Sequence, residues 1–202
     1  MRDANVLFAG FGGHGMLLAG KILAYAAVEE GRQVSWLPAY GAEMRGGTAN
    51  VTVCMSDKEV GSPYIERPDA LVAMNTPSLL KFGSKVKSGG FIIINTTLVK
   101  DKYTRDDLNI LRLDAAEPAI KYSTIKSTNI VLLGAYAGLT QTVSFESVKT
   151  AIIKQFASRP KIVDGNTAAF KAGFEIADSF LKKVIIANKN LSLDCNDNIR
   201  ER

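Results

Sequence analysis

The sequence predicts an α/β protein with an open, mostly parallel, Rossmann-like sheet that carries helices on both faces. Three observations predict it. Short apolar runs alternate along the chain with longer helical patterns, as they do in sheets built with crossover connections. Ile92, Ile93 and Ile94 form a continuous β-branched run, which is typical of a strand covered on both faces. A glycine-rich segment separates the first apolar run from the first helical pattern, where a strand-to-helix turn is expected.

The first elements follow from local signals. Residues 6–9 form an apolar strand ended by glycines, and residues 16–30 are rich in good helix formers up to Gly31. This helix is apolar nearly all round, so we expect it to be buried on several sides. A second strand is predicted at 33–37, where Pro38 ends it, and a third at residues 48–55.

The middle of the chain continues the alternation. Polar turns after the third strand let residues 59–60 pair back as a hairpin. Residues 69–74 form a further apolar strand. Thr76 is predicted to cap a short helix that has Pro77 at its first position and reaches residue 82.

The remaining elements are two strands followed by helices. The strands are predicted at residues 91–95 and 109–113. Helices are expected at residues 115–121, 129–139, 145–156 and 167–187. Thr128 is predicted to cap the second of these helices and Ser144 the third, and the chain enters the fourth through Asn166.

We expect a single domain over residues 1–187. Residues 188–202 have little apolar surface to bury, so a frayed C-terminal tail is predicted there.

Composition excludes several classes of protein. The 202 residues are 47% hydrophobic and 22% charged, which is typical of a soluble globular protein. The net charge of +5 is spread along the chain, so nucleic acid is not an expected partner. No apolar stretch approaches the roughly 18 residues that a membrane span needs, and the first apolar run is too short for a signal peptide. A cytoplasmic location is therefore expected.

The cysteine count limits the metal chemistry. Cys54 and Cys195 lie far apart in the chain and form no zinc-binding pattern. An iron–sulfur cluster is held by about four thiolates. We therefore expect no metal site in this chain.

A glycine loop follows the first strand and matches the pattern GxGxxG. Glycines there permit a tight turn, and the free N–H groups at a helix start favour an anion. Close packing of strand against helix is the alternative role. The candidate residues of this loop are Gly10, Gly12, Gly13, His14 and Gly15.

Two nucleotide sites are disfavoured. A dinucleotide site has an acidic residue at the end of the second strand, where this chain has Ser35 to Pro38. Residues 15–21 read GMLLAGK, but Ile22 stands where a phosphate-binding loop has Ser or Thr to reach magnesium. NAD, FAD and ATP hydrolysis are therefore not supported.

His14 is the only histidine of the chain. It has no adjacent acidic residue that would orient its ring. A structural hydrogen bond and a chemical role are both open, and its position makes it the first side chain to mutate.

A second unusual segment spans residues 40–50, between two predicted strands. It reads YGAEMRGGTAN and combines a charge pair with three glycines. Arg45 suits a phosphate or carboxylate, whereas a local ion pair with Glu43 on a solvated turn is the simpler interpretation.

Together these segments carry a family resemblance. GFGGHG, then LLAGKILA, AYGAEMRGGTANVTV, DALVAMN and GGFIIIN resemble the gamma subunit of 2-oxoacid:ferredoxin (acceptor) oxidoreductases, the pyruvate/ketoisovalerate oxidoreductase catalytic-domain family. The resemblance covers residues 5 to about 95, and more loosely the helices to about 187. The two glycine segments in this order are far more specific than either alone.

The resemblance implies one subunit of a larger enzyme. Such complexes oxidatively decarboxylate a 2-oxoacid on thiamine diphosphate, pass electrons through iron–sulfur clusters to ferredoxin or another acceptor, and release acyl-CoA. It implies that thiamine diphosphate, Mg and 4Fe-4S clusters sit on alpha and beta subunits, with delta as a further candidate partner. The gamma-type chain, inactive alone, would enclose the active site and contact CoA.

The resemblance also implies site residues. From the second segment these are Tyr40, Gly41, Glu43, Arg45, Gly46, Gly47 and Thr48, beside the five residues of the first loop. The first loop would offer N–H groups and the second the Arg45 cation, both at carboxyl ends of strands. No catalytic residue is identified. Family members commonly carry Gln where this chain has His14.

Other polar residues have two interpretations. Asn75 and Asn95 end predicted strands and would either face the site or cap the following turn. Lys81, Lys85 and Lys87 would either meet a CoA phosphate or form a solvated helix end.

Two other functions remain open at this point: a stand-alone nucleotide-binding Rossmann-like domain, and a purely structural assembly module. Among 2-oxoacids, 2-oxoglutarate is favoured, by fold-level analogy with separate gamma subunits that have a short tail and no fused ferredoxin segment.

Overall fold

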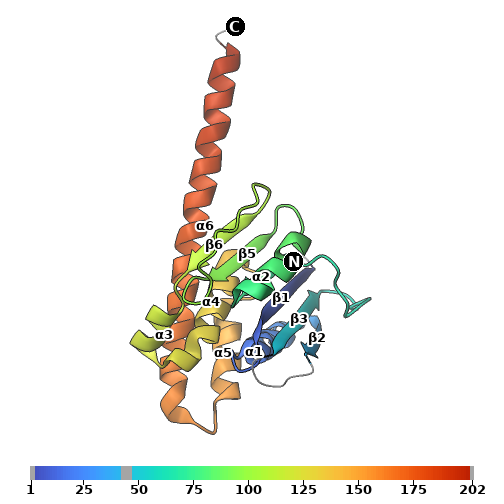
Figure 1. Cartoon of the computed structure of the whole chain (residues 1–202), viewed down its shortest axis with the longest axis vertical. Helices are drawn as coiled ribbons and strands as arrows, with labels where there is room; N and C mark the ends of the chain where they lie inside the picture. Colours follow the sequence, from blue (N-terminus) through green and yellow to red (C-terminus); the bar gives the residue numbers. More distant parts are fainter. Residues whose placement is uncertain (1–2, 42–46, 201–202) are drawn as a thin grey trace.

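The computed structural model describes residues 3–41 and 47–200, and the side chains of the last helix as far as Val184 (Figure 1). The strands are β1 (Ala4–Phe11), β2 (Gln33–Tyr40), β3 (Thr48–Ser56), β4 (Ala70–Ala73), β5 (Phe91–Asn95) and β6 (Asn109–Leu113). The helices are α1 (Met16–Glu29), α2 (Thr76–Phe82), α3 (Ala116–Tyr122), α4 (Thr128–Thr140), α5 (Phe145–Gln155) and α6 (Val163–Arg200). Short 3-10 turns are η1 (Gly83–Lys85), η2 (Ile125–Ser127) and η3 (Pro160–Ile162).

Within the described residues, six strands form one sheet in the order β2-β3-β1-β4-β5-β6. β1, β4, β5 and β6 are parallel, whereas β3 runs antiparallel to both β1 and β2. The prediction of an open, mostly parallel sheet is confirmed. Because β2 runs in the same direction as β1, the ends of β1, β2, β4 and β5 and the start of β3 share one edge of the sheet, here called the carboxyl edge.

Side chains alternate between the two faces of the sheet, as the period of a strand requires. In β1, Val6 and Phe8 join the core beneath α1, α4, α5 and α6, whereas Leu7 and Ala9 join a smaller cluster. That smaller cluster includes Leu79 of α2. Figure 1 shows α2 on the near face of the sheet, with α4 and α6 behind it. Helices therefore cover both faces, as predicted.

The most deeply buried helix is α4, not α1. Every residue of α4 from Thr128 to Leu139 is buried. In α1, Tyr25 and Val28 are 50% and 55% exposed, although the apolar sequence led us to expect burial on several sides. α1 buries one face against the sheet, α4 and α5, and leaves the other in solvent.

Two strand predictions are wrong. Pro38 does not end the second strand, because β2 continues to Tyr40. β2 lies at the edge of the sheet, where a residue without an N–H is tolerated. Residues 59–60 form no hairpin with β3, since both sides of β3 are already taken by β1 and β2.

Helix caps differ from the predictions in two places. The cap of α2 is Asn75, whose Oδ1 accepts from Ser78 N at 2.9 Å, while Thr76 donates its hydroxyl to Asp101. Thr128 is the first residue of α4 and donates to Ile125 O, so it is not a cap. Ser144 caps α5 as predicted, accepting from Ser147 N at 3.1 Å.

The last helix is longer than predicted at both ends. α6 begins at Val163, following η3, and Asn166 lies inside it, where its Oδ1 accepts a hydrogen bond from Ser127. The helix continues to Arg200 and does not end at residue 187. The division into a domain over 1–187 and a tail over 188–202 stays a prediction.

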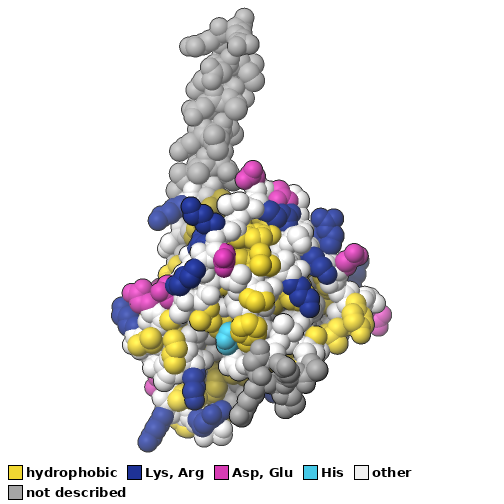
Figure 2. Space-filling model, viewed as in Figure 1, with side chains coloured by type: hydrophobic (Ala, Val, Ile, Leu, Met, Phe, Trp, Pro, Cys, Tyr) yellow, Lys and Arg dark blue, Asp and Glu magenta, His cyan; other side chains and the backbone are white. Residues whose placement is uncertain are grey.

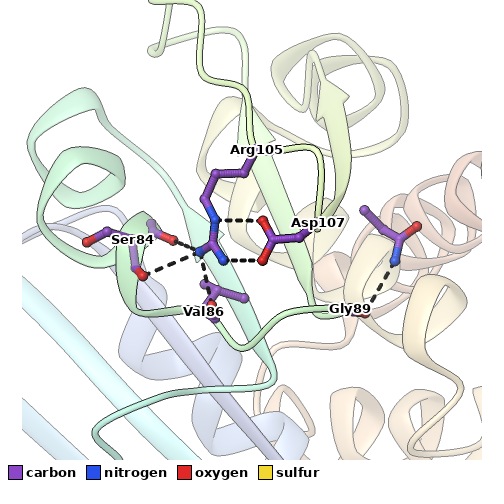
Figure 3. A network of polar contacts seen from close by, with 7 residues as sticks. Ser84, Val86, Gly89, Arg105 and Asp107 are labelled. Atoms are coloured by element: carbon purple, nitrogen blue, oxygen red, sulfur yellow. Dashed lines mark hydrogen bonds and ion pairs between the residues drawn. The ribbon is translucent and has the colours of Figure 1, made fainter.

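A polar network holds the connection that leads into β5 (Figure 3). Arg105 pairs with Asp107 through Nε and Nη2, and its Nη1 donates to the carbonyl oxygens of Gly83, Ser84 and Val86. The guanidinium thus ties the strand-to-strand segment after β5 to the end of η1. In the portion of the chain that the structure describes, no helix is both long and apolar enough to cross a membrane.

Candidate functional site

The first glycine loop joins β1 to α1 at the carboxyl edge. Gly13 and Gly15 adopt φ of 99° and 74°, which L side chains rarely adopt. A Cβ on Gly10 would lie 2.9 Å from Met74 Cβ, and one on Gly15 would lie 2.6 Å from Asn129 Nδ2. Gly10 and Gly15 therefore have a packing role, whereas Gly13 is exposed and has open space around its Cα.

The second predicted segment closes the hairpin between β2 and β3. Tyr40 pairs with Ala49 in the ladder, and Gly41 N donates to Thr48 O at 2.8 Å. Tyr40 and Thr48 are exposed. The predicted site residues Glu43, Arg45 and Gly46 lie outside the described residues, as do the other two residues between 42 and 46.

The structure brings the two glycine segments together. Gly12 N donates to Gly47 O at 2.9 Å, although the two residues lie on different loops. The contact continues the pairing of β1 with β3, whose last partners are Phe11 and Thr48. The end of the segment between β2 and β3, at Gly47, therefore lies beside the strand-to-helix loop after β1.

A cavity of about 270 Å³ opens next to the first loop. It lies at the carboxyl edge, between the ends of β1, β4 and β5 and the start of α4. A cavity of this size is smaller than the roughly 300–1,000 Å³ typical of sites that enclose a whole drug-sized ligand, so it suits part of a larger molecule. Its lining residues are Gly13, His14, Met74, Asn95, Thr97, Leu98, Ile125, Lys126 and Thr128.

A larger cleft, of about 450 Å³, opens at the opposite edge of the sheet. Its lining groups Arg32, Asp69 and Lys87 have partners within the protein. Arg32 donates to Thr142 O and Met55 O, and Lys87 pairs with Asp69 at 2.7 Å. Open α/β sheets place ligands outside the carboxyl ends of their strands. We therefore assign the candidate site to the smaller cavity.

His14 is held by its own loop. Its Nδ1 accepts from Phe11 N at 3.3 Å, and its ring lies 5.7 Å from the Phe11 ring, centroid to centroid. Burial lowers the pKa of His14 below its ordinary value, because desolvation disfavours the imidazolium. Figure 2 shows the chain's single histidine at the surface, bordered by hydrophobic side chains. His14 is therefore a neutral, partly exposed group at the site.

The two asparagines at strand ends serve the fold. Asn75 caps α2. Asn95 is fully buried, and its Oδ1 accepts from the backbone N of Thr97 and Ala115 while its Nδ2 lies 2.9 Å from Met74 Sδ. The interpretation of both as turn-capping residues is confirmed, although Asn95 also lines the cavity.

Lys87 does not lie near the glycine loop. Its side chain pairs with Asp69, which precedes β4 and therefore stands at the edge opposite the candidate site. Lys81 lies in the last turn of α2, and Lys85 lies at the end of η1. The solvated-helix-end interpretation of these lysines fits the structure better than a phosphate site.

Several residues of the site were missed by the sequence reasoning. Asn129, Lys126, Ile125 and Thr128 reach the first glycine loop from the start of α4 and the turn before it. A usable signal was present, because Asn129 is a polar residue opening an otherwise apolar helix. Thr97 and Leu98 lie in the loop that follows β5, and their signal is their position directly after the carboxyl end of a predicted strand.

The potential metal-binding side chains in the described part of the chain do not gather into a metal site. No group of three or more His, Cys, Asp or Glu side chains gathers in residues 3–41 and 47–184. Cys54 is buried, and its Sγ lies 3.9 Å from Pro63 O. Burial raises the pKa of this thiol, which disfavours the thiolate that a metal requires.

Comparison with known proteins gives consistent matches. The family described as pyruvate ferredoxin/flavodoxin oxidoreductase matches residues 5–176. The ketoisovalerate oxidoreductase subunit VorA of Methanothermobacter thermautotrophicus is 42% identical over 176 residues, which are 87% of this chain and 36% of that protein. The 2-oxoglutarate synthase subunit KorC of Methanocaldococcus jannaschii is 34% identical over 179 residues, covering 86% of this chain and 93% of that protein. The chain thus spans about a third of the length of the VorA relatives, with 36% and 37% of two of them covered.

Two solved structures share the fold. The gamma subunit of a keto/oxoacid ferredoxin oxidoreductase from Geobacter sulfurreducens matches with a TM-score of 0.73 and 32% identity, over 86% of this chain and 98% of that one. A 2-oxoglutarate:ferredoxin oxidoreductase from Magnetococcus marinus, with 2-oxoglutarate, coenzyme A and succinyl-CoA bound, matches with a TM-score of 0.80 over 89% of this chain and 32% of that one. At 22% identity this second likeness concerns the fold alone.

Proposed function

The chain belongs to the pyruvate ferredoxin/flavodoxin oxidoreductase family, and from this premise we propose that it is the gamma-type component of a 2-oxoacid:acceptor oxidoreductase complex. The complex would oxidatively decarboxylate a 2-oxoacid to an acyl-CoA and pass electrons to ferredoxin or another acceptor. This chain would act in the cytoplasm, enclose part of the active site and contact CoA, and would be inactive alone.

The observation that carries the proposal is the hydrogen bond from Gly12 N to Gly47 O. It joins the two glycine segments at the carboxyl edge, beside the cavity that His14 lines. The N–H groups of Gly12 and His14 are used within the loops, so the backbone N–H groups of Gly13 and Gly15, together with the second segment including Arg45, would be the groups available to an anionic, extended molecule such as CoA. Gly12, Gly13, Tyr40, Gly41, Glu43, Gly46 and Thr48 would complete this proposed surface, and Gly10 and Gly15 would shape it by close packing.

The cofactors of the reaction are assigned to partners. The two cysteines of the chain are too few for a 4Fe-4S cluster, which takes about four thiolates. We assign thiamine diphosphate, Mg and the clusters to alpha and beta subunits, with delta as a further candidate. Thiamine diphosphate would supply the carbanion stabilisation that decarboxylation needs. This chain's residues would shield the site from water and position CoA.

Two 2-oxoacids are candidates. 2-Oxoglutarate is supported by the similarity to KorC, whose length this chain nearly covers. A branched-chain acid is the second candidate, because the identity to the ketoisovalerate subunit VorA is higher. The side chains that read the acid would belong largely to the partner subunits.

The test is to purify the complex that forms around this chain and to assay it with 2-oxoglutarate, 2-ketoisovalerate and pyruvate. We expect CoA-dependent reduction of ferredoxin or a viologen dye, with one acid preferred by kcat/KM. Arg45→Ala should raise the KM for CoA. Full CoA-dependent activity of the partner subunits without this chain would contradict the proposal and favour a purely structural module.

A further inference from the structure

The cavity beside the first glycine loop has few polar groups left for a ligand. Asn95 uses both ends of its amide within the protein. Thr97 donates its hydroxyl to Asp114 at 2.6 Å and accepts from Ala116 N. Thr128 donates to Ile125 O at 2.6 Å. These three side chains line the cavity. Both threonine hydroxyl donors are committed, and the fully buried Asn95 amide has one of its N–H groups on Met74 Sδ.

Among the described lining side chains that reach solvent, two donors remain, and His14 carries the first. Because Nδ1 accepts the Phe11 amide, the hydrogen-bond network assigns the proton of the neutral ring to Nε2. Nδ1 faces the backbone of its own loop, so Nε2 is turned away from it. Among the residues that the structure describes, Nε2 has no hydrogen-bond partner. The loop that holds the ring is fixed in turn by Asn129, which donates to Gly15 O.

Lys126 carries the second donor. It belongs to η2, lines the same cavity and is exposed. It forms no hydrogen bond or ion pair with any other described side chain. The rest of the lining includes Met74, Leu98 and Ile125, of which Leu98 and Ile125 are 48% and 53% exposed. The cavity therefore offers two solvent-facing side-chain N–H donors against an apolar wall.

We infer that this cavity binds an apolar chain that carries acceptor oxygens, with His14 Nε2–H and the Lys126 ammonium as its two donors. The inference rests on the proposed function and identifies the bound apolar chain as the pantetheine arm of CoA. Pantetheine has amide oxygens that a neutral donor satisfies. The carboxylate of a 2-oxoacid would have Lys126 as its sole cation among the described lining residues, and a desolvated carboxylate needs closer pairing than one exposed ammonium offers.

The test compares four variants in the purified complex. His14→Ala removes one donor, Lys126→Met removes the other, and His14→Gln keeps an amide that can both accept from Phe11 N and donate to the ligand. Lys58→Met is the matched control, because Lys58 follows β3 at the opposite edge of the sheet and is exposed. Circular dichroism and thermal melting confirm that each variant is folded.

We expect His14→Ala and Lys126→Met each to raise the KM for CoA about 3- to 10-fold, because each variant loses one hydrogen bond to the ligand. The KM for the 2-oxoacid should stay unchanged, and His14→Gln and Lys58→Met should retain the KM for CoA. An unchanged KM for CoA in both donor variants would overturn the inference. A rise confined to the KM for the 2-oxoacid would overturn it too, and would assign the cavity to that carboxylate.

Failure of the proposed function is a separate outcome. It would appear as a wild-type complex that oxidises no 2-oxoacid with CoA. The inference is then tested by calorimetry of pantetheine with the wild-type complex and its His14→Ala variant. Weaker binding by the variant supports the inference, whereas equal binding or no binding to either contradicts it.

Discussion

The side-chain amide of Asn129 donates a 2.9 Å hydrogen bond to the carbonyl oxygen of Gly15. Asn129 is buried in the first turn of α4, and Gly15 immediately precedes α1. The first glycine loop is therefore held against the most deeply buried helix of the fold. This contact explains why a loop of small residues can keep His14 in one position.

Gly15 is expected to tolerate substitution less well than Gly13. Both have positive φ, but a Cβ on Gly15 would also lie 2.6 Å from Asn129 Nδ2, whereas one on Gly13 would meet nothing within 4 Å. Gly13→Ala should cost about 1–3 kcal/mol of unfolding free energy from backbone strain alone. Gly15→Ala should cost about 1–3 kcal/mol more because of the clash. Urea unfolding measures both, and equal losses would contradict the role of Asn129.

Asn129→Ala should destabilise the protein by about 1–3 kcal/mol, because it removes a buried donor and leaves Gly15 O with only the hydrogen bond from Ala19 N. It should also raise the KM for CoA in the complex, since the loop that carries His14 loses its anchor. Lys58→Met again serves as the control. A change of stability below about 0.5 kcal/mol, the scatter of ordinary surface substitutions, would refute the anchoring role.

The stability of the protein should depend on His14 in mildly acidic solution. Burial lowers the pKa of His14 from 6.5 in the folded state, so the unfolded chain takes up the proton first. The resulting stability is fully present above about pH 6.5 and declines as the pH falls toward the lower, folded pKa. The difference in unfolding free energy between wild type and His14→Gln, followed from pH 8 to about pH 5, should change in that window. A constant difference would show that burial does not perturb His14.

Arg105→Gln should loosen one connection without unfolding the domain. The guanidinium holds the carbonyl oxygens of Gly83, Ser84 and Val86, and it lowers the pKa of Asp107 by hydrogen bonding to it (Figure 3). In the variant, amide hydrogen exchange should accelerate over residues 83–90, and the pKa of Asp107 should rise toward its ordinary value of 3.8. In the wild type, the contribution of Asp107 to stability is present at neutral pH and is lost as the pH falls through the lowered pKa. In the variant this contribution should disappear. Unchanged exchange in this segment would contradict the role of Arg105.

The fold class was predictable because strands and helices have different hydrophobic periods. The run from Ile92 to Ile94 had the signal of a strand covered on both faces, and it is buried. The errors arose where tertiary position overrides a local signal. Pro38 is tolerated inside β2 because that strand lies at the edge of the sheet, and Asn75 displaces Thr76 as the cap of α2.

The candidate site was predictable in part. Gly10, Gly12, Gly13, His14 and Gly15 stand together in the sequence, and the motif located them. Asn129 was marked only by its polarity at the start of an apolar helix. Neither it nor Lys126 could be connected with the loop from the sequence, because both reach it from more than one hundred positions along the chain. The prediction for Arg45 stays a prediction, since that residue lies outside the described part of the chain.

The sequence by itself determined the alternation of strands and helices, the glycine loop between β1 and α1, and the lack of thiolates for a cluster. These depend on residue type and on neighbours within a few positions. Only the tertiary structure decided that Gly12 meets Gly47, that Asn129 anchors Gly15, and that His14 and Lys126 carry the solvent-facing side-chain N–H donors of the cavity. Which polar groups are already paired depends on strand order and helix packing, and those long-range contacts are not encoded in any local pattern.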